Sequence, residues 1–170
     1  MSTLYVDNIY SKTGTSQALT IDSSGRVTTP ARPAFHVKWS ADQVATGTGY
    51  NRLNFDTELF DVGSNVSGAV FTAPVSGIYQ LNLSQRFDGI GSGYVVLGLS
   101  DNASTFSAAN TLWVTSYRIN GTPPSNYFTL QCSLTYELTS GSVVAPWYYT
   151  TDSNYSLKVS GSQFSGYLVG

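Results

Sequence analysis

Charged side chains are scarce in this sequence. Asp, Glu, Lys and Arg together make up 11% of the 170 residues, and the formal net charge is −2. A typical soluble domain has about 25% charged residues. The few Lys and Arg residues are scattered, so no basic stripe is available to neutralise phosphates. We therefore expect no binding to nucleic acid.

Cysteine and histidine are each present only once. One cysteine excludes an internal disulfide, whereas secreted domains more often carry paired cysteines. Cys132 has apolar neighbours two positions away on both sides, which predicts a buried thiol that packs as a small hydrophobic group. His36 cannot assemble a zinc site with one distant cysteine, and we interpret it as a surface or edge-strand residue.

Long apolar runs are also missing. No stretch approaches the roughly 20 apolar residues of a membrane-spanning helix. Residues 1–14 lack the basic start and apolar middle of a secretory signal. We therefore expect no membrane span and no export through a standard signal, a combination that would fit a virus particle released by lysis.

Patterns typical of catalysis are absent or incomplete. DGIGSG at 88–93 lacks the lysine and helix that follow a phosphate-binding loop, so we expect a turn between strands. No G-x-S-x-G supports a nucleophilic serine. Asp56, Glu58 and Asp61 could supply calcium ligands or glycosidase carboxylates, but we interpret them as solvated charges at a strand end. The sequence predicts no enzyme, no metal site and no cofactor.

What the sequence does contain is strict alternation of apolar and polar residues. In 77–87 the odd positions are mostly apolar, in 127–138 the even positions are, and 34–40 and 155–161 repeat the pattern. Alternation with a period of two predicts half-buried antiparallel strands. Turn clusters separate these runs, and no stretch has helical spacing. The pattern predicts an all-β, antiparallel jelly-roll sandwich of about ten strands.

The first 30 residues are more polar than the rest and contain two short strand candidates, 4–10 and 18–22. Leu19 and Ile21 share one face of the second candidate. Residues 22–25 have turn-forming chemistry, and Val27 begins a return strand, which predicts a small β-hairpin.

Two prolines follow this hairpin. Pro30 and Pro33 fix their own φ angles and favour extended geometry in the residues before them. We predict a stiff joint that connects an N-terminal stem, residues 1–30, to a globular head, residues 31–170, whose first strand starts near Ala34.

Aromatic residues are in surplus, with 12 Tyr, 8 Phe and 3 Trp. Trp147, Tyr148 and Tyr149 stand together close to turn residues. Tyr and Trp present a large rigid surface with a polar tip, which suits both subunit interfaces and sugar faces. The three side chains could therefore lie in the core, at a subunit interface or against a glycan.

Three stretches resemble the globular head of complement C1q, a jelly roll shared with tumour-necrosis-factor-like ligands. They are F-x-x-P-x-x-G-x-Y at 71–79, FDTELFDVG at 55–63 and FSGYLV at 164–169. The residues that carry the resemblance are Phe55, Asp56, Phe71, Pro74, Gly77, Tyr79, Phe164, Gly166 and Tyr167. The resemblance covers residues 31–170 and implies a homotrimer packed through an aromatic-rich face.

The N-terminal segment is similar to the opening of many small tailed-phage virion proteins. The similar features are a V-D-x-I strand, the run LTIDSSGRV and a P-x-x-P-A-F joint. The similarity implies a location in the virion, where the stem binds other phage proteins of the capsid or tail. The expected anchoring side chains are Leu4, Val6, Ile9, Leu19, Ile21 and Val27.

Three hypotheses follow for the function. The leading one is a non-enzymatic structural protein of a phage virion, either a capsid decoration (cement) protein or a short fibre. The alternative is a tail-fibre receptor-binding protein whose trimeric head binds host-surface glycans. The third, a glycan depolymerase, would require paired carboxylates at one site.

Overall fold

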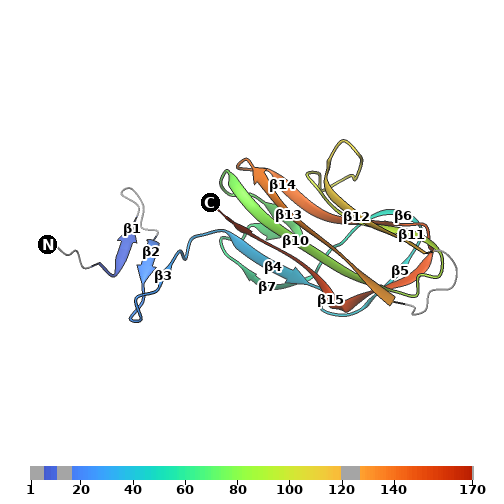
Figure 1. The fold of residues 1–170 in the computed structure, drawn as a ribbon, viewed down its shortest axis with the longest axis horizontal. Helices are drawn as coiled ribbons and strands as arrows, with labels where there is room; N and C mark the ends of the chain where they lie inside the picture. Colours follow the sequence, from blue (N-terminus) through green and yellow to red (C-terminus); the bar gives the residue numbers. More distant parts are fainter. Residues whose placement is uncertain (1–5, 11–16, 120–126, 170) are drawn as a thin grey trace.

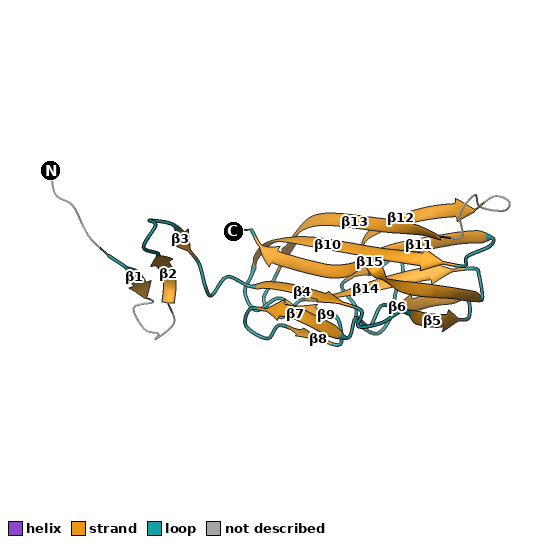
Figure 2. Cartoon of the chain, turned by 90° about the horizontal axis from the view of Figure 1, so that it is seen from below, coloured by secondary structure: helices purple, strands orange, loops and turns teal. Residues whose placement is uncertain are grey.

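The computed structural model describes residues 6–10, 17–119 and 127–169, and every regular element in these ranges is a β-strand. All strand pairings are antiparallel. A small N-terminal sheet lies beyond one end of a two-layer sandwich (Figures 1 and 2). The fold confirms the all-β, antiparallel prediction.

The N-terminal sheet has three strands in the order β1-β2-β3. Their bounds are β1 Asn8–Tyr10, β2 Gln17–Ile21 and β3 Val27–Thr28. The predicted hairpin is therefore present as β2 and β3, and the first strand candidate adds a third strand to it.

Asp22 organises the turn of this hairpin. Its carboxylate accepts hydrogen bonds from the backbone N–H groups of Ser24 and Arg26 at 2.9 Å each, and from Arg26 Nε at 2.6 Å. Gly25 has a φ of 77°, a left-handed conformation that glycine adopts without steric cost. The turn chemistry predicted for residues 22–25 is thus confirmed.

The joint after the hairpin is a turn that docks on the sandwich. Pro30 lies inside it, and the N–H of Arg32 donates to the carbonyl of Thr29 at 3.0 Å. The carbonyl of Pro33 then accepts from the N–H of Leu168 at 3.0 Å. The ladder of the sandwich therefore begins with the first residue of β4, Ala34.

The sandwich consists of two six-stranded sheets. The first has the order β13-β10-β15-β4-β7, with β5 also paired to β15. Its bounds are β4 Ala34–Lys38, β5 Gln43–Thr46, β7 Thr57–Asp61, β10 Gly77–Asp88, β13 Tyr127–Leu138 and β15 Asn154–Leu168.

The second sheet has the order β12-β11-β14-β9-β8, with β6 also paired to β14. Its bounds are β6 Gly49–Arg52, β8 Val66–Ser67, β9 Val70–Thr72, β11 Gly93–Ser100, β12 Thr111–Ile119 and β14 Val143–Thr150. The edge strands β12 and β13 lie on one side of the sandwich, and β7 and β8 lie on the other (Figure 2).

The core follows the predicted alternation closely. Tyr79, Leu81, Leu83 and Phe87 of β10 are at most 2% exposed and pack in one cluster with apolar residues of the second sheet. Gln85 is on the same face and is also fully buried. Its amide oxygen accepts a hydrogen bond from the Trp39 indole N–H at 3.0 Å, which compensates for the burial of this polar group. The polar alternates of β10 point to the outside of the sandwich.

The stretch 143–150 is a continuous strand, β14, which ends directly before the turn residues 151–153. A proline inside a strand normally costs a ladder hydrogen bond. β14 tolerates Pro146 because its partner changes there: residues 143 and 144 pair with β9, and residues 147–150 pair with β6. The proline carbonyl still accepts from the N–H of Leu53 at 2.9 Å.

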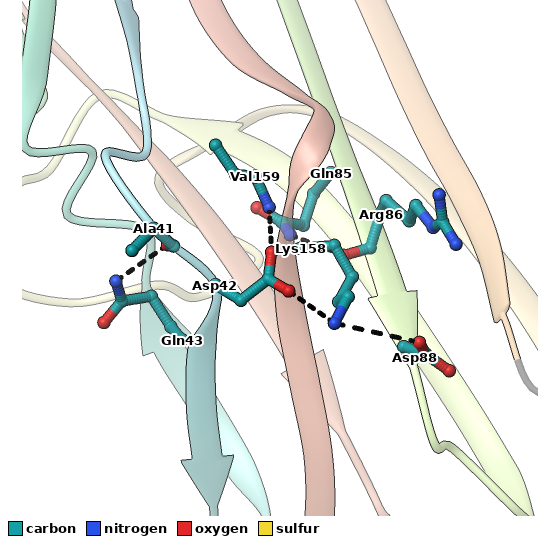
Figure 3. Close-up of polar contacts among 8 residues, drawn as sticks. All are labelled: Ala41, Asp42, Gln43, Gln85, Arg86, Asp88, Lys158 and Val159. Atoms are coloured by element: carbon teal, nitrogen blue, oxygen red, sulfur yellow. Dashed lines mark hydrogen bonds and ion pairs between the residues drawn. The ribbon is translucent and has the colours of Figure 1, made fainter.

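A polar network ties β5, β10 and β15 together at the end of the sandwich remote from the N-terminal sheet (Figure 3). The Asp42 carboxylate accepts from the Val159 N–H at 2.8 Å and pairs with Lys158 at 2.5 Å. Lys158 also lies 4.0 Å from Asp88. The contact with Lys158 lowers the pKa of Asp42 below its ordinary value.

Candidate functional sites

The residues that resemble the C1q head mostly build the core. The ring of Phe35 stacks on Phe71 at 4.6 Å and meets Phe164 edge-on at 4.9 Å. Tyr79 packs on Phe71 at 5.4 Å, and its hydroxyl donates to the carbonyl of Val75 at 2.8 Å. Burial raises the pKa of Tyr79. These side chains hold the two sheets together and leave no room for a ligand.

Gly166 is required by close packing between β15 and β10. A Cβ atom at this position would lie 2.7 Å from Leu81 Cδ2 and 2.8 Å from Phe35 Cε1. Among the other residues of the resemblance, Phe55 packs on Trp39 at a ring distance of 4.8 Å. Tyr167, which follows Gly166 in β15, points outward and is 48% exposed.

Asp56 directly precedes β7 and holds Ser40, which follows β4, by hydrogen bonds. Its carboxylate accepts from the backbone N–H and the hydroxyl of Ser40, at 2.7 Å each, and these bonds lower its pKa. Glu58 is exposed, and Asp61 accepts from the Val66 N–H at 2.7 Å. The structure therefore assigns Asp56 and Asp61 to turns and strand ends rather than to one paired-carboxylate site.

The open edge of the sandwich carries an aromatic surface. Trp113 and Tyr117 of β12 stand opposite the buried Leu99 and Val95 of β11, so they face inward. They are nevertheless 45% and 47% exposed, and the inward-facing Tyr136 of β13 is 41% exposed. The described residues therefore cover these inward-facing side chains only in part. We call Trp113, Tyr117, Leu134 and Tyr136 the open seam.

The residues next to the open seam are closely packed. Phe128 packs on Tyr117 at 5.0 Å and on Phe87 at 5.6 Å. Cys132, on the same strand as Phe128, is 5% exposed. Burial raises its thiol pKa to about 12. The predicted buried thiol is confirmed.

Trp147 and Tyr148, predicted as core, interface or glycan-contacting residues, are core residues of the single chain. Their exposures are 7% and 5%. The Trp147 indole N–H donates to the carbonyl of Asn102 at 3.2 Å, and the Tyr148 hydroxyl pairs with that of Tyr155 at 2.9 Å. Because their own chain covers them, neither side chain is available to a sister subunit or a glycan.

Tyr149 points outward from the second sheet, unlike its neighbour Tyr148. Its ring lies 4.7 Å from that of Tyr50 on β6 and 5.2 Å, stacked, from that of Tyr94 on β11. The nearby Tyr94 hydroxyl raises the pKa of Tyr149. The three tyrosines form a second exposed aromatic surface, separate from the open seam.

The predicted anchoring residues of the stem share a face. Ile9 stands opposite Leu19 and Ile21 stands opposite Val27 in the ladder, and Leu19 and Ile21 are two positions apart on β2. Ile9 is 46% exposed and Val27 is 62% exposed. We call these four residues the stem face. Val6 precedes β1 and is also exposed, and Leu4 lies outside the described residues.

Within residues 6–10, 17–119 and 127–169, no three His, Cys, Asp or Glu side chains are grouped to hold a metal ion. His36 lies half-buried on the outer face of β4, edge-on to the Phe60 ring at 6.0 Å. No helix in the described part of the chain could span a membrane.

Comparison with solved structures gives the fold. Murine APRIL superimposes with a TM-score of 0.60 at 12% identity, over 81% of this chain and 99% of that one. The globular domain of zebrafish complement 1qA gives 0.55 at 19%, over 82% and 98%, and Eiger TNF from S. frugiperda gives 0.59 at 13%, over 82% and 92%. The chain therefore has the TNF/C1q jelly-roll fold. No protein-family model and no curated protein matches the sequence.

Proposed function

We propose that the protein is a non-enzymatic structural component of a bacteriophage particle. In this proposal three copies form a jelly-roll head through the open seam, and the stem face attaches the trimer to a capsid or tail protein. The observation that carries it is a pair of partly exposed apolar surfaces on different parts of the chain. In the open seam, Trp113, Tyr117 and Tyr136 are 41–47% exposed, and in the stem face Ile9 and Val27 are 46% and 62% exposed.

The stem face supports attachment. Isolated small sheets are marginally stable in water, so a sheet with one apolar face gains stability when that face is covered. The sheet lies beyond the end of the sandwich in both views (Figures 1 and 2). In the stem face Ile9 and Val27 are exposed, and Leu19 and Ile21 are half-buried. Sister stems or a virion protein would supply the missing cover.

The open seam supports the trimer. Half-exposed aromatic residues lie on the inner faces of two edge strands. An apolar surface that continues the core in this way is typical of obligate interfaces. A closed ring also needs a second, different surface on each subunit. Phe60 and Tyr167 supply it in this proposal, because both point outward from the first sheet and are 49% and 48% exposed.

Incorporation into particles tests the attachment. The double variant Leu19→Asp/Ile21→Asp places charges on the stem face, and Thr20→Asp places one on the opposite face of β2 as a matched control. Purified particles of the phage that encodes the protein should contain the control and lack the double variant, as measured with an antibody to the head. Equal incorporation of both would contradict the assigned role of the stem face.

A further inference from the structure

The outward-facing tyrosines form a surface at the far end of the head. Tyr50, Tyr94 and Tyr149 come from β6, β11 and β14, and we call them the distal tyrosine patch. β5 and β6 lie at the end of the sandwich opposite to the N-terminal sheet in both Figure 1 and Figure 2. If the stem faces the particle, this patch faces away from it.

The patch exposes ring surface and hydroxyl groups together. Tyr50 is 55% exposed and Tyr94 is 41% exposed, with the half-buried Tyr149 between them. The rings of Tyr94 and Tyr149 are close to parallel, with an interplanar angle of 25°, whereas Tyr50 is tilted by 58° from Tyr149. A ligand that has both an apolar ring face and hydroxyl groups fits such a surface.

The loop 101–110 packs against one side of the patch. Its Phe106 ring lies 5.3 Å from Tyr50 and sits over Gly98, where a Cβ atom would come within 3.0 Å of Phe106 Cζ. Arg52 donates to the carbonyl of Ala103 at 3.0 Å, which fixes the same loop to β6. The surface is therefore preorganised, which lowers the entropic cost of binding.

The strands that carry the patch have charge of one sign, whereas the carboxylates of Asp101 and Asp152 lie in the adjoining loops. The outward positions of β6, β11, β12 and β14 include Arg52 and Arg118 and no carboxylate, although the protein as a whole has a net charge of −2. Arg118 stands directly opposite Tyr94 in the ladder, is exposed, and forms no ion pair with any described residue. A guanidinium at this position can bind a carboxylate in the bidentate manner.

We propose that the distal tyrosine patch binds an acidic saccharide, with the sugar ring against Tyr94 and Tyr149 and its carboxylate on Arg118. The arrangement combines planar rings, hydroxyl groups and the Arg118 guanidinium, which matches a carboxylated pyranose. A neutral sugar would leave Arg118 without a partner. The inference concerns the head surface alone and does not depend on attachment to a virion.

The test uses the full-length protein and defined oligosaccharides. The probes are tetramers of mannuronate, galacturonate and sialic acid, each compared with its carboxyl-reduced counterpart, which keeps the ring and loses the charge. Calorimetry or NMR titration should show binding to at least one acidic probe and at least tenfold weaker binding to its reduced form. Higher salt should weaken the acidic interaction.

Two variants locate the site. Arg118→Gln should weaken binding of the acidic probe at least tenfold and leave binding of the reduced form unchanged, whereas Tyr94→Ala should weaken both. Arg32→Gln and Tyr10→Ala change the same residue types near the stem and should bind like the parent protein. The proposal is overturned if no acidic probe binds, if acidic and reduced forms bind equally, or if both patch variants bind normally.

Discussion

Tyr136 of β13 lies directly opposite Tyr79 of β10 in the ladder, yet Tyr79 is fully buried and Tyr136 is 41% exposed. Both side chains point to the inner side of the same sheet. The difference arises because β13 is an edge strand, and the facing edge strand β12 leaves this side of the sandwich open. Exposed apolar surface of this kind is typical of protein–protein contacts.

The first prediction concerns this open seam. Tyr136→Asp and Trp113→Asp would each bury a charge in the proposed interface, so both proteins should sediment as folded monomers. Ser116→Asp is the matched control, because Ser116 lies on the same strand as Trp113 but points outward and is exposed. Analytical ultracentrifugation, with circular dichroism as a check of folding, gives the answer. Wild-type mass in both seam variants would show that subunits meet elsewhere.

The second prediction concerns the buried amide of Gln85. Gln85→Leu removes the acceptor of the Trp39 indole N–H, and a buried unpaired donor costs about 1–3 kcal/mol of unfolding free energy. Gln131→Leu, at an exposed position of β13, should change stability by less than about 0.5 kcal/mol. Denaturant unfolding at one fixed protein concentration measures both. Equal stability of the two variants would mean that the Trp39 contact contributes little.

The third prediction concerns the close approach at Gly166. The added methyl of Gly166→Ala would overlap Leu81 and Phe35, and overpacking of this kind typically costs about 1–3 kcal/mol. Gly91→Ala is a suitable control because its added Cβ would be 3.9 Å from the nearest atom, Asp152 Oδ2. Thermal unfolding should show a lowered midpoint for Gly166→Ala alone. An unchanged midpoint would contradict the tight packing of β15 against β10.

The fourth prediction concerns the reactivity of Cys132. Burial raises its thiol pKa from 9.0 to about 12, so almost no thiolate is present at pH 8. A thiol reagent such as 5,5′-dithiobis(2-nitrobenzoate) should leave the native protein unlabelled and should label it fully once guanidinium unfolds it. Rapid labelling of the native protein at pH 8 would show that the open seam admits solvent to the thiol.

The period of the sequence predicted the sheets well because burial in a sandwich follows strand alternation. The odd positions of 79–87 and the glycine-rich turns around them lie where the pattern places them. The alternation also marked Tyr136 as inward-facing. It could not show that Tyr136 is half-exposed, because that depends on which strands form the edges of the sheets.

Residue clusters proved less predictable than strands. Trp147, Tyr148 and Tyr149 are adjacent in the sequence, but strand geometry sends Tyr148 inward and Tyr149 outward, and the loop 101–110 covers Trp147. Tyr149 instead joins Tyr50 and Tyr94, which are remote in sequence. A cluster of this kind depends on long-range register, which a single sequence does not contain.

The stem illustrates the opposite case. Alternation within 18–21 and a turn at 22–25 were sufficient to place Leu19, Ile21 and Val27 on one face, because local geometry determines a hairpin. The partner proposed for that face cannot be derived from hairpin geometry, and the proposal rests on the sequence resemblance to virion proteins.

The mass of the protein in solution tests the central claim most directly. Light scattering coupled to size-exclusion chromatography on the full-length protein should give three times the chain mass of 18.3 kDa, independent of dilution over the micromolar range. A stable species of 18.3 kDa would contradict the proposed trimer and the role assigned to the open seam.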